Sequence, residues 1–226
     1  NMKNKLRRPD HFSYLKYVNQ TKSLLLFSCD SNLQEIIKLL LDIESIDVNS
    51  ECEDEVFKKR NCFDSCCENC DKNILELFLT KFSKKLIIHL PLHFACRGDK
   101  LDNFQYLMSK INIDINKVDH MDRTCLHYAC EINNVKFVKE ILSIPNVIYD
   151  SKDKNQNSPF FIALKNSSIE CLKCLLSFNN SSLININETD IDNNDSPLHI
   201  ACKLNNIEII KLILPNQKID INIQNK

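Results

Sequence analysis

The sequence of 226 residues almost lacks glycine, since Gly98 is its only one. Such a chain needs other residues wherever its backbone turns left-handed, and asparagine is the best substitute there. It also lacks an excess of charge of one sign, because 29 Lys and Arg residues and 30 Asp and Glu residues leave a net charge of −1. A nucleic-acid partner is therefore not expected, since phosphate binding needs a clustered positive field.

Long apolar runs are absent as well. Stretches such as residues 24–27 are far too short to cross a bilayer or to form the core of a signal peptide. With 43% apolar and 26% charged residues, the composition is that of a folded globular chain. We therefore expect a cytoplasmic protein without membrane insertion, whose 12 cysteines stay reduced.

What the sequence does contain is a seven-residue segment that recurs along its length. The clearest copy, T-C-L-H-Y-A-C, covers residues 124–130, and L-P-L-H-F-A-C and S-P-L-H-I-A-C cover residues 90–96 and 196–202. A weaker copy, S-P-F-F-I-A-L, covers residues 158–164. A segment that recurs roughly every 30 residues indicates one supersecondary element stacked on copies of itself.

The small residue next to the end of this segment provides a reference position in each unit. These residues are Ser28, Cys66, Ala95, Ala129, Ala163 and Ala201. Three residues earlier there is always an apolar side chain: Leu25, Phe63, Leu92, Leu126, Phe160 and Leu198. A later stripe, such as Val138, Ile141 and Leu142, has helical spacing in every unit. The pattern predicts six units, each with a short first helix, a turn and a longer second helix.

Polar residues and prolines mark the ends of these helices. Thr124, Ser158 and Ser196 are expected to cap first helices, and Pro91, Pro159 and Pro197 suit the first helical position. Asn133-Asn134, Asn166-Ser167 and Asn205-Asn206 fall where a left-handed turn joins the two helices.

Segments after the second helices predict short hairpin fingers between units. Three segments share an Asp-x-Asn pattern, at residues 47–49, 114–116 and 220–222, and residues 185–187 are a variant. The polar turn at residues 119–123 then reads as the tip of a finger. Residues 50–59 are expected to form an enlarged or disordered finger.

The L-H-x-A-C segments, in register with the L-x-x-L-L stripes, resemble the ankyrin-repeat family over roughly residues 20–226. The resemblance implies an all-α solenoid of stacked helix-turn-helix repeats with short β-hairpin fingers, forming a single elongated, curved domain. The repeats are expected at about residues 20–49, 57–85, 88–116, 119–150, 153–187 and 190–226. Residues 1–19 are expected to be an N-terminal extension that caps the stack.

The second repeat departs most from the family pattern. It has Asp64 where other units have histidine, and its connection to the third repeat is short. A regular hairpin is therefore not expected between the second and third repeats.

Histidines at one position of three units invite a catalytic interpretation, because histidine is a common general base. These residues are His93, His127 and His199. The resemblance implies instead that each ring bonds to backbone or to a capping hydroxyl in a neighbouring turn. A nucleophile would need a non-repeating Ser or Cys beside an oriented base, and the sequence offers none. We therefore expect no catalytic residues and no enzyme activity.

The cysteines allow a second alternative. Cys29, Cys67, Cys96, Cys130 and Cys202 follow the reference position, where small thiols are expected to pack. Cys62, Cys66, Cys67 and Cys70, with Cys52 nearby, could make a metal- or redox-responsive cluster, but they lack paired C-x-x-C knuckles. We expect no metal and no cofactor. Cys171 and Cys174 are expected to be a solvated or half-buried pair.

Ankyrin repeats usually hold partners with their finger tips and with the exposed face of their first helices. The resemblance implies protein-binding residues at matching positions: His120, Met121, Arg123, Glu131, Ile132, Lys154, Asn155, Asn157, Lys165 and Lys203. Further matching positions are Arg97, Asp192, Asn193, Asp195 and Leu204. The expected function is a monomeric, non-enzymatic protein-interaction module. The alternative is a targeting or regulatory segment of a larger enzyme or signalling protein.

Overall fold

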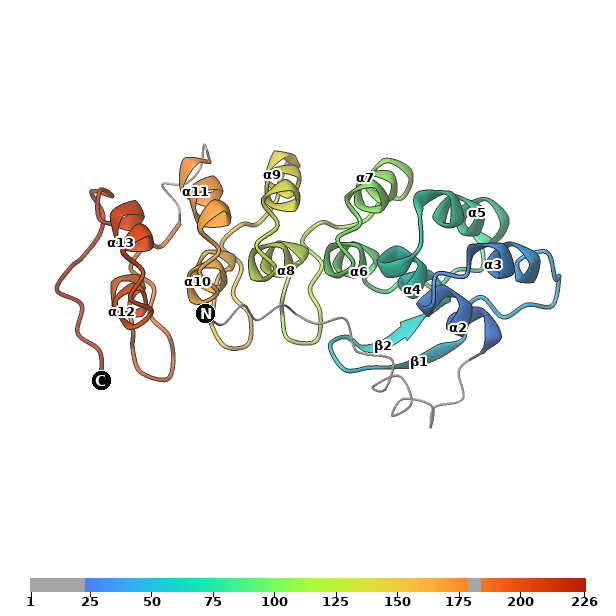
Figure 1. Cartoon of the computed structure of the whole chain (residues 1–226), viewed down its shortest axis with the longest axis horizontal. Coiled ribbons are helices and arrows are strands. Elements are labelled where there is room, and N and C mark those ends of the chain that lie inside the picture. Colours follow the sequence, from blue (N-terminus) through green and yellow to red (C-terminus); the bar gives the residue numbers. More distant parts are fainter. Residues whose placement is uncertain (1–22, 179–183) are drawn as a thin grey trace.

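The computed structural model describes residues 23–178 and 184–226 and shows an elongated row of helix pairs (Figure 1). First helices lie beside one another in one layer and second helices in another, and the connecting fingers extend beyond the first-helix layer. This is the all-α solenoid that the repeat pattern predicts. The expected cap over residues 1–19 lies outside the described residues.

The described residues form six helix pairs and one pair of strands. In chain order these are α2 (Leu24–Asp30), α3 (Gln34–Leu40), β1 (Glu51–Asp54), β2 (Lys58–Asn61), α4 (Cys62–Asn69), α5 (Lys72–Phe82), α6 (Pro91–Arg97), α7 (Leu101–Lys110), α8 (Cys125–Glu131), α9 (Val135–Ser143), α10 (Pro159–Lys165), α11 (Ile169–Ser177), α12 (Pro197–Lys203) and α13 (Ile207–Ile213). The exact limits of each repeat stay a prediction.

The first helices begin where the polar residues and prolines predict. Pro91, Pro159 and Pro197 lie in the first turns of α6, α10 and α12, where a missing N–H breaks no helical hydrogen bond. Ser158 caps α10, since its hydroxyl accepts a hydrogen bond from the Phe161 backbone N–H at 3.1 Å. Local sequence signals therefore determine where these first helices begin.

Left-handed turns join the two helices in five of the six pairs, all but α4 and α5, and residues other than glycine occupy them. Asn133, Ser167 and Asn205 have φ of 55°, 55° and 51°. Asn32 and Asp99 adopt the same conformation, with φ of 52° and 54°. Short polar side chains tolerate this region because they hydrogen-bond locally.

Gly98 has a different role, because its φ is −79° and needs no glycine. A Cβ atom built on this residue would lie 1.9 Å from the backbone oxygen of Glu68. Glycine therefore allows the C-terminal ends of α4 and α6 to approach more closely than any side chain permits.

The Asp-x-Asn pattern is explained by a bridge between successive units. The side chain of Asn116 donates to the Asn146 backbone oxygen at 2.9 Å and accepts from the Ile148 N–H at 2.7 Å. Asn49 and Asn187 make the same pair of bonds to the units that follow them. Each asparagine thus satisfies backbone groups of the next unit and sets the spacing of the stack.

One finger is a true hairpin. Strands β1 and β2 pair antiparallel, with Glu51 opposite Asn61 and Asp54 opposite Lys58. The enlarged finger predicted at residues 50–59 is therefore present, and it is ordered rather than disordered. Between α5 and α6 the described chain forms no strand, as its short length predicts.

The later fingers are tight turns closed by backbone hydrogen bonds. The Asp119 N–H donates to the Arg123 oxygen at 3.0 Å, and Asp153 and Asp190 begin equivalent turns. The Asp119 carboxylate accepts from the N–H groups of Met121 and Arg123 at 2.7 and 2.9 Å. An aspartate at the start therefore fixes the shape of each turn.

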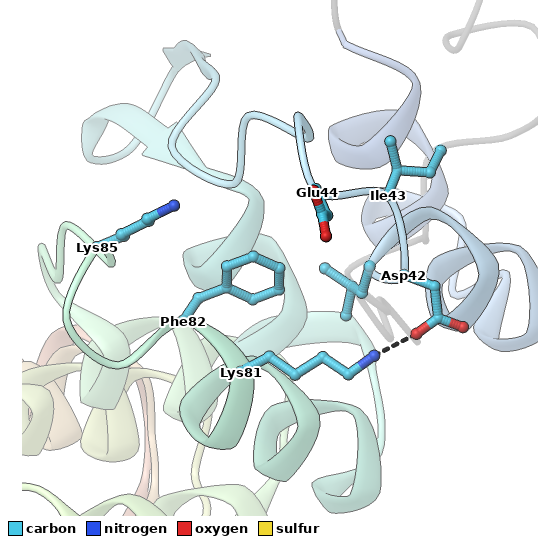
Figure 2. A pocket seen from close by; sticks show the side chains of 7 residues that line it. Asp42, Ile43, Glu44, Lys81, Phe82 and Lys85 are labelled. Atoms are coloured by element: carbon cyan, nitrogen blue, oxygen red, sulfur yellow. Dashed lines mark hydrogen bonds and ion pairs between the residues drawn. The ribbon is translucent and has the colours of Figure 1, made fainter.

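An open hollow of about 480 Å³ lies between the first two units (Figure 2). It is lined by Leu41, Asp42, Ile43, Glu44, Lys81, Phe82 and Lys85. Lys81 and Asp42 form an ion pair at one side of it. The hollow contains none of the residues expected to bind a partner.

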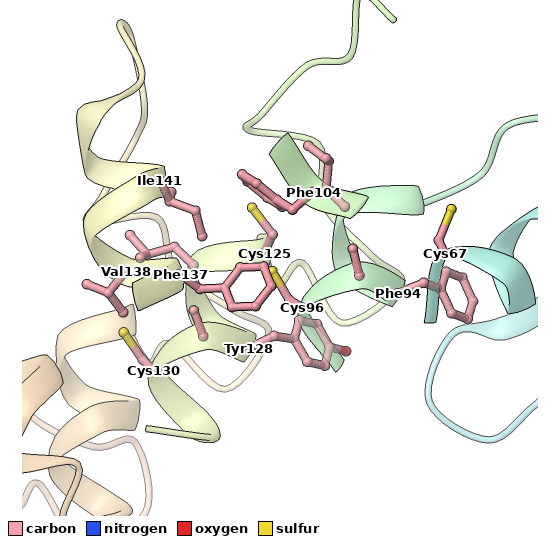
Figure 3. Packing of buried hydrophobic residues seen from close by; sticks show 14 of the residues in the cluster. Cys67, Phe94, Cys96, Phe104, Cys125, Tyr128, Cys130, Phe137, Val138 and Ile141 are labelled. Carbon is pink, nitrogen blue, oxygen red and sulfur yellow. The ribbon is translucent and has the colours of Figure 1, made fainter. Parts of the chain in front are cut away.

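The core is continuous through the stack, because equivalent apolar residues meet in neighbouring units (Figure 3). Leu126 is 0% exposed, and the rings of Phe104 and Phe137 meet edge to face with centroids 5.5 Å apart. The last unit differs, since Leu198 is only partly buried and Cys202 is exposed. The prediction that the Cys202 thiol packs was wrong, because α12 belongs to the last helix pair that the structure describes and, among the described first helices, has only α10 beside it.

Candidate protein-binding surface

The repeated histidines have structural partners. His127 Nδ1 lies 2.9 Å from the Thr124 hydroxyl and accepts from the Thr124 backbone N–H at 3.0 Å, while Nε2 faces the Asn157 backbone oxygen at 3.3 Å. His93 Nε2 lies 3.0 Å from the Arg123 oxygen in the same way. Each of these rings therefore joins its helix to the finger of the next unit, and the structural interpretation is confirmed.

Burial lowers the pKa of His93 and His127 to about 4, because the charged ring would lose its hydration there. In the unfolded chain their pKa would be about 6.5. As the pH falls below 6.5, the unfolded state binds protons before the folded state does. The stability that these two neutral rings contribute is therefore fully present above pH 6.5 and is lost between pH 6.5 and pH 4. His89 opposes this trend, since its contact with Asp64 raises its pKa.

We expect the free energy of unfolding to fall by roughly 2 kcal/mol per buried histidine between pH 7 and pH 5. Urea titrations at both pH values, followed by circular dichroism, measure this loss. A chain with His93→Gln and His127→Gln should lose clearly less over the same interval, although its stability at pH 7 is lower. An unchanged pH dependence in the double variant would show that other groups cause the loss.

The cysteines behave mainly as small apolar side chains. Burial raises the pKa of Cys66, Cys67, Cys96 and Cys130, so these thiols stay protonated. Within the described ranges no three His, Cys, Asp or Glu side chains are placed to hold a metal ion. Cys174 is half-buried as expected, but Cys171 is fully buried, because it faces the core from α11.

Two predicted contact residues lie at the tip of one finger and two more on the next. His120 and Met121 are half-buried in the turn before α8, while Lys154 and Asn155 are exposed in the turn before α10. The Lys154 N–H donates to the Met121 oxygen at 2.9 Å, and its ammonium group donates to the His120 oxygen at 2.5 Å. The two fingers therefore contact each other and present one surface.

Three expected contact residues are less accessible than the sequence suggests. Asn157 is 7% exposed and Asp195 is 1% exposed, because both close the turns of their fingers. The side chain of Arg123 is 17% exposed and pairs with Asp119 and Tyr128. The prediction that Asn157 and Asp195 offer free surface was wrong.

The exposed residues of the first helices pair with the finger eight positions earlier. Lys165 Nζ donates to Asn157 Oδ1 at 2.9 Å, Lys203 forms an ion pair with Asp195, and Glu131 lies 3.4 Å from Arg123. An earlier unit has the same spacing between Arg60 and Glu68, at 3.1 Å. This spacing is visible in the sequence and could have shown that Glu131, Lys165 and Lys203 hold their own fingers in place.

The remaining expected residues differ in their exposure. Ile132 is half-buried at the end of α8, and Asp192, Asn193 and Leu204 are exposed. Arg97 is different, because the enlarged hairpin covers it and binds its guanidinium group. Sequence reasoning missed this contact completely.

Comparison with known sequences agrees with this architecture. A family profile described as ankyrin repeats (3 copies) matches residues 63–153 and 133–225, which is more than half of the chain. The chain therefore belongs to the ankyrin-repeat family. Ankyrin repeats are protein–protein interaction modules.

Several curated proteins share part of the sequence. The chain is 35% identical to Inversin from Canis lupus familiaris over 88 residues, which are 39% of the chain and 8% of that protein. It is 26% identical to the putative ankyrin repeat protein L271 of Acanthamoeba polyphaga mimivirus over 180 residues, 70% of the chain and 24% of that protein. It is 30% identical to human SMC5-SMC6 complex localization factor protein 1 over 138 residues, 59% of the chain and 13% of that protein.

The chain thus spans less than a quarter of the length of each of these relatives. In the part of the chain that the structure describes, each helix is too short or too polar to cross a membrane.

Proposed function

We propose that the chain is a non-enzymatic module that recognises a partner protein with its fingers and the adjacent face of its first helices. The observation that carries this proposal is the contact between the two fingers around Met121 and Lys154. This contact places the apolar Met121 side chain beside the exposed polar group of Lys154. An apolar centre with polar groups around it is the usual arrangement of a protein interface.

The fingers are also rigid. The Asp119 carboxylate holds one turn, Asp153 holds the next, and Lys165 braces the second turn from α10. A surface that is ordered before binding loses little conformational entropy when a partner arrives. This rigidity favours recognition by shape, and the repeated histidines His93, His127 and His199 are occupied by structural bonds.

A second possibility is a targeting or regulatory segment of a larger enzyme or signalling protein. It is favoured by the small share of each relative that the chain covers. The full-length reading frame distinguishes the two possibilities. The monomeric state and the cytoplasmic location stay predictions, which light scattering and imaging of a tagged protein can check.

Changing His120 and Met121 together to alanine should weaken partner capture at least tenfold while leaving the melting temperature nearly unchanged. Both side chains lie at a finger tip and contribute little to the core. Affinity capture with the intact chain and with the variant, followed by quantitative mass spectrometry, measures the difference.

The matched control is Lys136→Ala with Lys139→Ala, which changes two exposed residues of the outer helix α9. This control should retain the partner. The variant with alanine at positions 120 and 121 could instead have a melting temperature as low as that of a variant with a charged residue buried in the core. The assignment of that finger to a binding surface would then be wrong.

A further inference from the structure

The tip of the enlarged hairpin lies against first helices of later units. Phe57 lies in the turn between β1 and β2, yet this residue is only 6% exposed. Its ring lies 4.5 Å from the ring of Phe94 on α6 and 5.2 Å from that of Tyr128 on α8, measured between centroids. His93 completes the contact, with its ring centroid 6.0 Å away.

A carboxylate accompanies this aromatic ring. Asp54, three residues before Phe57, accepts two hydrogen bonds from the guanidinium group of Arg97, both at 3.0 Å. The same guanidinium carbon lies 4.7 Å from the Phe57 ring centroid and 5.0 Å from that of Phe94. Arg97 therefore recognises the acid and the aromatic ring together.

Glu68 on α4 also holds Arg97 in this position, beside the contact from the hairpin tip. Its carboxylate accepts from Arg97 Nε at 2.7 Å and from a second guanidinium nitrogen at 2.6 Å. The pocket made by His93, Phe94, Arg97 and Tyr128 is thus ordered by its own helices.

The hairpin is fixed at its base, where Arg60 forms ion pairs with Asp30 and Glu68, so a competing ligand displaces its tip rather than the whole hairpin. In the described chain its strands pair only with each other, and an isolated two-stranded hairpin is marginal in water. Lys58, next to Phe57, has φ of 70°, which is unfavourable for a lysine. Asp54 and Phe57 make the contacts of the tip with α6 and α8 that are described above.

The hairpin tip also differs from the other fingers in how far along the stack its contacts extend. It starts before α4 and contacts α6 and α8, which belong to the next two helix pairs (Figure 1). These helices form the layer beside the fingers, where the proposed function places a partner. The hairpin therefore covers part of that same surface.

We propose that this pocket is a recognition site for a partner peptide that carries an acidic residue three positions before an aromatic one, and that the hairpin tip occupies it as an internal competitor. This inference rests on the proposed function, since it names the chemistry of one part of the binding face. A tethered competitor has a high effective concentration, so a short peptide displaces it only in large excess, whereas a partner with further contacts, such as those at the fingers, displaces it at lower concentration.

The test uses the full chain with Phe57→Ala and a fluorescent peptide that copies residues 53–59. Fluorescence anisotropy should show at least tenfold tighter binding of this peptide to the variant than to the unchanged chain. A control peptide, in which alanine replaces the residue copied from Phe57 and asparagine replaces the one copied from Asp54, should not bind. Adding Arg97→Gln to the variant should remove the binding.

Circular dichroism establishes that the variant is folded. A second measurement avoids the core-facing substitution and places 4-fluorophenylalanine at position 57 of the otherwise unchanged chain. A millimolar excess of the peptide should shift the fluorine resonance from the buried towards the solvent-exposed position. An unchanged resonance, or equal binding of the control peptide to a folded Phe57→Ala chain, overturns the proposal.

The two proposals fail in different ways. If the peptide does not bind but the His120 and Met121 variant loses its partner, the binding face is correct and the pocket assignment is wrong. If the peptide binds and that variant keeps its partner, the pocket is correct and the finger tips are not the contact.

Discussion

Replacing Leu126 by aspartate should lower the free energy of unfolding by about 4 kcal/mol or more. Leu126 is 0% exposed in α8, which packs between α6 and α10, so the new carboxylate would be buried without a partner. Ala129→Asp should act in the same way, because this side chain is also fully buried. Urea unfolding followed by circular dichroism measures the loss.

The matched control is Lys139→Asp, which places the same carboxylate on the exposed face of α9. It should change the free energy of unfolding by about 0.5 kcal/mol or less. Similar stabilities for the Leu126 and Lys139 variants would contradict the stacking of α8 between its neighbours.

Gly98→Ala should cost about 3 kcal/mol, the upper end of the usual penalty for overpacking. The added Cβ would lie 1.9 Å from a backbone oxygen, and a backbone group cannot rotate out of the way as a side chain can. The ends of α4 and α6 would have to separate. Thermal and urea denaturation of the variant measure the cost.

Ile132→Ala is the appropriate comparison, because Ile132 follows α8 as Gly98 follows α6. This residue is half-buried, so its truncation should cost only about 1 kcal/mol. If alanine were tolerated equally well at both positions, the close approach of Glu68 would not be the reason for the glycine.

The fold could be predicted because neighbouring units supply nearly identical surroundings. A leucine at the position of Leu126 meets the same kinds of neighbours in each inner unit, so its burial follows from the repeat alone. The capping role of Ser158 and the left-handed turn at Asn133 are local and are equally visible. At the last unit the surroundings change, which is why Cys202 is exposed.

The candidate site was harder to predict, because it depends on contacts that do not repeat. The family pattern locates the fingers correctly, but it cannot show that Asn157 turns inward to close its own turn. Phe57 lies in the charged stretch that the sequence predicts to be an enlarged or disordered finger, and its contacts with Phe94 and Tyr128 cross two units. Such a contact follows from the bend of one hairpin and has no counterpart in the other fingers.

Photo-crosslinking tests the central claim most directly. A benzoylphenylalanine residue is placed either at Met121 on the finger tip or at Lys136 on the outer helix α9, and each chain is incubated with its captured partner. The account predicts a crosslinked product from position 121 and none from position 136. Crosslinking from position 136 alone would show that the partner binds the outer helices, and that the fingers are only part of the scaffold.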